Sequence, residues 1–180
     1  MKQTILIHGA PYEKEFYDAT KPSPSNGVWL PWLQKQFALK NELCQVLEFP
    51  RPFDPVYEEW VKVFEQLKLN KETTLIGHSC GGGFLLRYLS EHQIKVSKIF
   101  LVAPWIDPDK ELTTGFFDFQ INPMISDYNE IHILLSTDDG PDLLKSFEII
   151  KSALPKVTYH EHSDKGHFTE KEIPELLPLL

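Results

Sequence analysis

The sequence has few cysteines, no run of basic residues and no long hydrophobic stretch, and each absence excludes a class of protein. Two cysteines, Cys44 and Cys80, are too few for a small secreted scaffold held by disulfides. The 26 acidic residues outnumber the 18 lysines and arginines, and the net charge of -8 argues against nucleic acid as a partner. The apolar run that follows the N-terminus is too short for a signal peptide or a membrane span. We therefore expect a cytoplasmic protein that binds neither nucleic acid nor membrane.

Signatures of cofactor and metal binding are also missing. No glycine-rich phosphate loop and no G-x-G-x-x-G follows a predicted strand, so nucleotide binding is not expected. His160, His162 and His167 could be drawn as a zinc site, but the sequence has no H-E-x-x-H helix and its cysteines lack ligand spacing. We expect neither a cofactor nor a metal.

What the sequence does contain is a regular alternation of strand and helix patterns. Strands are predicted over residues 4–8, 43–48, 73–77, 98–103, 131–136 and 156–160, and several of them are near-continuous runs of Ile, Leu and Val. Helices are predicted over residues 29–38, 55–67, 79–90, 141–153 and 170–179. Such alternation is typical of an α/β fold, here one domain over residues 1–180 with a parallel sheet of about six strands and helices on both faces.

Local signals mark where some of these helices begin. Pro55 and Pro141 suit the first turn of a helix, and Asp54 is a candidate cap for the helix at Pro55. Residues 169–172, Thr-Glu-Lys-Glu, have the form of a capping box and predict the start of the last helix.

Two segments, residues 9–28 and 104–130, exceed normal loop length, and each follows the end of a predicted strand. In a parallel sheet, ligands bind at the edge formed by the carboxyl ends of the strands. We therefore expect both segments to border a functional site.

The motif that points most directly to chemistry is Gly77-His78-Ser79-Cys80-Gly81, which fits the G-x-S-x-G nucleophile elbow. It lies between a strand pattern and a helix pattern, so the turn would lift the Ser79 hydroxyl clear of the sheet. A serine hydroxyl needs a base to take its proton, and a third group to orient that base.

The best candidate for the base is His167, in a glycine-containing loop between the last predicted strand and the last predicted helix. His160 and His162 are rivals at a strand end, where at most one would face the site. His8 is expected to shape the loop after the first strand, and His78 to support the elbow.

The acid is expected in the turn after the fifth strand, where Asp138 and Asp139 are adjacent. One of them could face His167 while the other caps a helix or braces the loop, and periodicity alone does not choose between them. Weaker candidates follow the fourth strand: Asp107, Asp109 and Asp118.

The developing oxyanion also requires hydrogen-bond donors. The backbone N–H of Cys80 is one expected donor, because it follows the nucleophile at a helix N-terminus. The other should come from the loop after the first strand, where we select Ala10.

With these motifs in place, the chain resembles the small α/β-hydrolases of the retinoblastoma-binding-protein-9-like serine hydrolase family. The matching stretches are residues 7–9, 29–33, 59–60, 76–82, 136–139 and 166–168. The resemblance implies a minimal α/β-hydrolase fold without a large lid domain. It also implies a triad of Ser79, Asp139 and His167 that acts on ester or amide bonds.

Aromatic residues concentrate in segments expected to border the site. One interpretation is an apolar acyl pocket formed by Trp29, Trp105, Phe116 and Phe117, and the alternative is that these rings pack the core. The leading hypothesis is a serine hydrolase of small acyl substrates, and the alternatives are an acyltransferase or a catalytically weak binding protein. The sequence indicates no particular protein partner.

Overall fold

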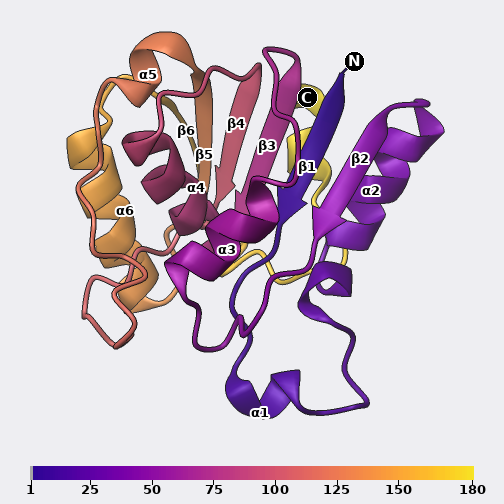
Figure 1. Ribbon diagram of the computed structural model, residues 1–180, viewed down its shortest axis with the longest axis vertical. Coiled ribbons are helices and arrows are strands. Elements are labelled where there is room, and N and C mark those ends of the chain that lie inside the picture. The colour runs from indigo at the N-terminus through magenta and orange to yellow at the C-terminus, as the bar shows by residue number, and fades with distance from the viewer. Residues whose placement is uncertain (1) are drawn as a thin grey trace.

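The predicted alternation becomes a six-stranded sheet in the computed structural model, which describes residues 2–180 (Figure 1). All neighbouring strands are parallel, in the order β2-β1-β3-β4-β5-β6. The strands are β1 (Gln3–Ile7), β2 (Leu43–Leu47), β3 (Thr73–His78), β4 (Lys98–Val102), β5 (Glu130–Ser136) and β6 (Thr158–His162). Because strand order reverses at β1, the crevice beside the carboxyl end of β1 is where ligands bind in open sheets of this kind.

Four of the predicted helices are confirmed with small changes at their ends. They are α2 (Leu30–Leu39), α3 (Tyr57–Phe64), α4 (Cys80–Glu91) and α6 (Pro141–Ala153). The structure adds short elements inside the two long segments: α1 (Glu13–Phe16) and η1 (Pro24–Asn26) in residues 9–28, and α5 (Ile125–Tyr128) in residues 104–130.

Two predictions about helix ends are wrong. The last helix does not begin at the Thr169 capping box, because only a 3₁₀ helix, η2 (Pro174–Leu179), forms there. Pro174 disfavours the helical region for the residue before it, and Pro178 removes a further backbone donor. Asp54 does not cap a helix at Pro55: α3 begins at Tyr57, and the Asp54 carboxylate pairs with Arg51 instead.

Each face of the sheet is covered by its own apolar layer, since successive strand side chains point to opposite faces. Ile5 and Ile7 of β1 belong to a cluster with buried residues of α3, α4 and α6. Leu6, between them, belongs to a second cluster with residues of α2 and η2. Both faces of the sheet are therefore buried, as the continuous apolar strand sequences predict.

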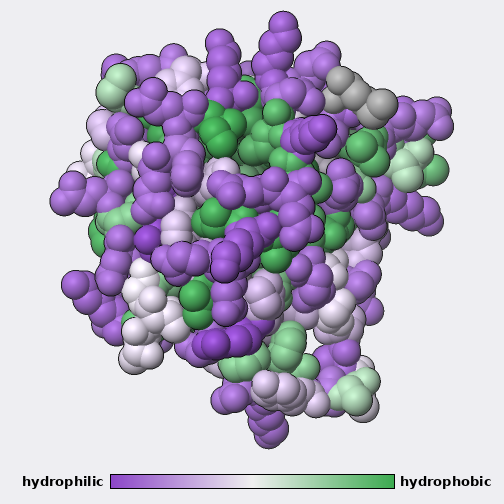
Figure 2. All heavy atoms as spheres, viewed as in Figure 1, coloured by the Kyte–Doolittle hydropathy of each residue, from purple (hydrophilic) through white to green (hydrophobic). Residues whose placement is uncertain are grey.

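The first long segment (residues 9–28) leaves the sheet at the carboxyl end of β1, and α1 extends beyond the body of the molecule (Figure 1). No residue of α1 is fully buried. Figure 2 shows that polar side chains dominate this face of the protein, whereas the surface around α1 is paler and carries light green areas. Within residues 2–180, no helix combines the length and apolar character needed to cross a bilayer.

The aromatic centre of the larger cluster gives a test of the packing. Phe84 of α4 is fully buried and makes ring contacts with Phe49, Tyr57, Trp60, Phe64, Tyr88 and Phe116. We expect Phe84→Ala to lower the free energy of unfolding by about 3–5 kcal/mol, because it leaves a cavity among these rings. The measurement is urea denaturation, with the exposed Leu39→Ala as control, expected to change stability by less than about 0.5 kcal/mol. Equal effects of the two variants would contradict this account of the core.

Candidate active site

Ser79 lies on the sharp turn between β3 and α4, in a backbone conformation that residues other than glycine rarely adopt. Its φ is 52° and its ψ is -121°. The Ser79 N–H donates to the Val102 carbonyl at 2.9 Å, and the Ser79 carbonyl accepts the Trp105 N–H at 3.1 Å. Strain of this kind persists only where the surroundings enforce it, and it is typical of a nucleophile elbow.

The two outer glycines of the elbow are required by close backbone approach. A Cβ on Gly77 would lie 2.6 Å from the Gly81 carbonyl oxygen. A Cβ on Gly81 would lie 2.5 Å from the His8 carbonyl oxygen. Only glycine therefore lets the start of α4 approach both β3 and the end of β1.

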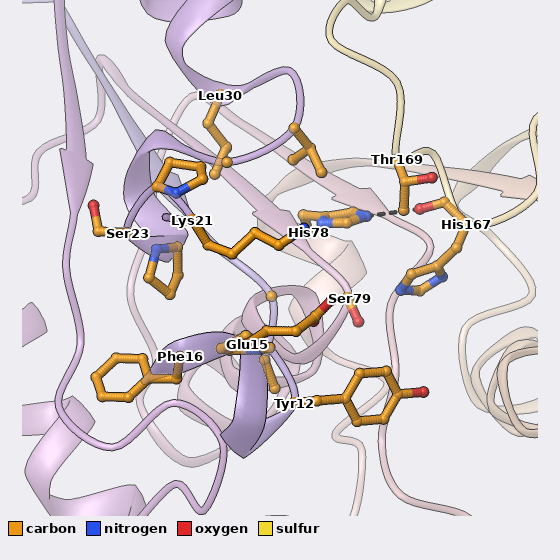
Figure 3. A pocket seen from close by; sticks show the side chains of 17 residues that line it. Tyr12, Glu15, Phe16, Lys21, Ser23, Leu30, His78, Ser79, His167 and Thr169 are labelled. Carbon is orange, nitrogen blue, oxygen red and sulfur yellow. Dashed lines mark hydrogen bonds between the residues drawn. The ribbon is translucent and has the colours of Figure 1, made fainter. Parts of the chain in front are cut away.

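His167 and Asp139 meet at the same edge of the sheet although they are 28 residues apart. Nδ1 of His167 lies 2.9 Å from Oδ2 of Asp139. The Gly140 N–H donates to the other Asp139 oxygen at 2.7 Å, and the Asp139 side chain is only 7% exposed. With Nδ1 donating to the carboxylate, Nε2 is the basic nitrogen, and Figure 3 shows the His167 ring turned toward Ser79.

Asp138 points to the backbone of the loop that carries His167 rather than to its ring. The carboxylate of Asp138 accepts the Gly166 N–H at 2.9 Å and the hydroxyl of Ser136. The same Ser136 hydroxyl oxygen accepts the Lys165 N–H at 3.1 Å. These bonds, that from Ser136 first, lower the pKa of Asp138. The adjacent aspartates therefore have different partners: Asp139 contacts the imidazole, and Asp138 holds its loop.

The carbonyl groups of the His167 loop (residues 165–168) are held by two buried rings. His78 Nε2 donates to the His167 carbonyl at 2.9 Å, and Trp29 Nε1 donates to the Phe168 carbonyl at 3.0 Å. Burial lowers the pKa of His78 to about 3, so this side chain is a neutral donor. His78 was expected to support the elbow turn, but its hydrogen bond goes to the His167 loop, and sequence reasoning missed the Trp29 contact.

The other histidines considered from the sequence have partners elsewhere. His160 Nε2 lies 3.0 Å from His132 Nδ1, and His162 packs edge-on against Phe168. His8 accepts the Phe49 N–H at 3.1 Å and donates to the Gly9 carbonyl at 2.8 Å, so it shapes the loop after β1. Among residues 2–180, no three His, Cys, Asp or Glu side chains are grouped so as to hold a metal ion.

Two of the three weaker acid candidates, Asp107 and Asp109, lie in other interactions. Asp107 is buried, and its carboxylate accepts the N–H groups of Glu111 and Leu112 at 2.8 and 2.9 Å. Asp109 pairs with Lys145 at 2.7 Å.

The two residues expected to supply oxyanion donors, Cys80 and Ala10, both lie near Ser79. Cys80 is the first residue of α4, so its N–H is one of the four that have no carbonyl partner within the helix. A Cβ on Gly9 would lie 3.0 Å from the Ser79 Cβ, which places the loop after β1 directly against the Ser79 side chain. Ala10, the next residue, lines the cavity at Ser79.

A cavity of about 430 Å³ opens at Ser79 and His167, and the first long segment forms most of its wall. Its apolar lining includes Pro11, Phe16, Val28 and Leu30, and its charged lining consists of Glu15 and Lys21 (Figure 3). The expectation that this segment borders Ser79 is confirmed, whereas no residue of the second long segment (104–130) lines this cavity.

The structure does not bring the four aromatic residues expected at the acyl pocket to this cavity. Trp29 and Phe116 are fully buried in the two core clusters. Trp105 and Phe117 pack edge to face at 5.4 Å, against Gly83 of α4. The core-packing alternative holds for these rings: Trp29 packs with residues of α2, and the other three pack with residues of α4.

The sheet order, the strained serine and the histidine–carboxylate pair define the chain as an α/β-hydrolase fold, and no separate lid domain is inserted within the described residues. A family model described as alpha/beta hydrolase fold matches residues 53–123.

The chain is similar to named hydrolases over most of its length. It is 28% identical to YdeN of Bacillus subtilis (strain 168), named as a hydrolase, over 99% of this chain and 92% of that protein. It is 26% identical to the serine hydrolase RBBP9 of Rattus norvegicus, over 83% and 82% of the two chains. The crystal structure of the B. subtilis ydeN product superimposes with a TM-score of 0.81 at 22% identity, covering 99% and 96% of the chains. The resemblance to retinoblastoma-binding-protein-9-like hydrolases is thus confirmed, and these similarities support a hydrolase activity.

The buried neutral His78 predicts a specific loss of stability in acid. Unfolded histidine has a pKa near 6.5. As the pH falls from about 6.5 to 4, the unfolded chain gains a proton at His78 that the folded protein does not accept until about pH 3. The free energy of unfolding should therefore fall by about 3 kcal/mol more in the wild type than in His78→Gln, whose amide retains a donor for the His167 carbonyl.

The measurement is urea denaturation of both proteins at several pH values. His8 is common to both, and burial also lowers its pKa, so its contribution cancels in the difference. Parallel stability curves for the two proteins would contradict the assignment of a buried neutral His78.

Proposed function

We propose that the protein is a serine hydrolase of small acyl substrates, with Ser79 as nucleophile, His167 as base and Asp139 as the group that orients His167. The observation that carries the proposal is the 2.9 Å contact between His167 Nδ1 and Asp139 Oδ2, at a cavity that also contains Ser79. A carboxylate on Nδ1 fixes the tautomer in which Nε2 can accept a proton.

In the proposed reaction, the Ser79 oxygen attacks the acyl carbon while His167 Nε2 takes the hydroxyl proton. The carbonyl oxygen becomes negatively charged and is stabilised by the N–H groups of Cys80 and Ala10. The tetrahedral intermediate collapses to an acyl-Ser79 ester, and His167 donates its proton to the departing alcohol. Water then attacks the ester with His167 again as base, which releases the acid and restores Ser79.

The loop contacts support this assignment. Productive proton transfer requires the His167 ring within hydrogen-bond reach of Ser79. Backbone bonds to Asp138, Ser136, His78 and Trp29 hold both sides of the His167 loop. Asp138 in this account is a positioning residue, and the proposal requires no cofactor because these side chains and water carry every proton step.

We expect Ser79→Ala and His167→Ala each to lower kcat for a p-nitrophenyl ester by about 10⁴–10⁶, since members of a triad act as a unit. The double variant should be no worse than either single variant. The measurement is steady-state hydrolysis by proteins whose unfolding transitions match the wild type. Unchanged hydrolysis by Ser79→Ala would rule out this nucleophile.

The adjacent aspartates offer a matched pair of substitutions. Asp139→Asn should lower kcat by about 10⁴, because the amide favours the wrong imidazole tautomer. Asp138→Asn should have a much smaller effect, because an amide oxygen can still accept the Gly166 N–H, whereas Asp138→Ala should lower kcat more than Asp138→Asn does. The measurement is steady-state kcat and KM for a p-nitrophenyl ester with each of the three variants. A larger loss in Asp138→Asn than in Asp139→Asn would reverse the assignment of the acid.

A further inference from the structure

The two sides of the cavity at Ser79 differ, because only one of them contains His167. Figure 3 shows His167 on one side of Ser79, and Phe16, Ser23 and Leu30 on the other. The leaving group must approach His167 to receive its proton. The acyl part of the substrate therefore extends the opposite way, into the space enclosed by the first long segment.

The chemistry of that space is mainly apolar and carries no net charge. Pro11, Phe16, Val28 and Leu30 supply apolar walls. One anion and one cation, Glu15 and Lys21, also line the cavity, so their charges offset each other. At about 430 Å³ the cavity is within the usual size range of small-molecule sites and larger than an acetyl group requires.

Phe16 is the residue of α1 best placed to determine which acyl groups fit. Phe16 lines the cavity, and its ring contacts that of Phe53, with ring centroids 5.1 Å apart. Tyr17, the next residue, contacts the same Phe53 ring at 5.5 Å, but it is 69% exposed and is not part of the cavity wall. The Phe16 and Tyr17 rings also contact each other, with centroids 5.3 Å apart, and of the two residues only Phe16 lines the cavity.

We propose that the first long segment is the acyl-binding wall, that it selects uncharged apolar acyl groups longer than acetyl, and that Phe16 is a specificity-determining residue. This inference rests on the proposed function, because it takes Ser79 and His167 as the reacting groups. Each methylene that enters the cavity should raise kcat/KM about twofold to fourfold until the space is filled.

The test is kcat/KM for p-nitrophenyl acetate, butyrate, hexanoate and octanoate with wild type, Phe16→Ala and Tyr17→Ala. For the wild type we expect kcat/KM to rise along the series. In Phe16→Ala the octanoate-to-acetate ratio should fall about tenfold, because the ring that contacts the far end of the chain is gone. Tyr17→Ala, which loses a similar Phe53 contact, should keep the wild-type ratio.

A second series separates the acyl side from the leaving-group side. Acetyl esters of alcohols of increasing length should show no comparable rise, since the alcohol faces His167. Selectivity in the alcohol series instead of the acyl series would overturn the proposal, as would equal ratios for Phe16→Ala and wild type. Equal loss of the ratio in Phe16→Ala and Tyr17→Ala would also overturn it, because loosening of the segment would then be the cause.

Failure of this inference differs from failure of the proposed function. If Ser79→Ala abolishes hydrolysis of the acetate but kcat/KM does not depend on acyl length, the acyl-wall proposal fails and the serine hydrolase proposal stands. If no hydrolysis depends on Ser79, both proposals fail.

Discussion

The close approach of the start of α4 to the end of β1 is the constraint on which the rest of the site depends. It brings the Gly81 backbone against the His8 carbonyl, leaving no room for a side chain. Once α4 is held there, Ser79 must adopt its strained conformation, and Gly9 must lie against the Ser79 side chain. Ser79, the first N–H of α4 and the start of the first long segment are thus positioned by one contact between a helix and a strand end.

Burial of polar rings beneath the His167 loop completes the arrangement. His78 and Trp29 pack edge to face at 5.6 Å, and each donates to a carbonyl of that loop. A buried ring N–H without a partner would be costly, so the rings and the loop fix each other. Asp138 and Ser136 bind the N–H groups on the other side of the same loop. The imidazole is consequently oriented by its backbone as well as by the Asp139 carboxylate, and this explains why two adjacent aspartates are used.

The sequence predicts the features that depend on local patterns and fails where packing decides. Strands such as β4 could be predicted because their residues are apolar on both faces, and the elbow because its glycines and serine lie within five residues. The choice between Asp138 and Asp139 could not be made from periodicity, since it depends on how the turn after β5 meets a loop 28 residues later. The aromatic residues expected at the acyl pocket pack in the core. The sequence shows that they are apolar but not toward which part of the fold their side chains point. The capping box at Thr169 predicts a last α-helix, but Pro174 and Pro178 prevent that helix from forming.

The central claim is that Ser79 is an activated nucleophile, and the most direct measurement is intact mass after exposure to a fluorophosphonate probe. The account predicts a single covalent adduct on the wild type, located on Ser79, and none on a folded Ser79→Ala variant. A well-folded wild type that forms no adduct, or an adduct that persists in Ser79→Ala, would contradict it.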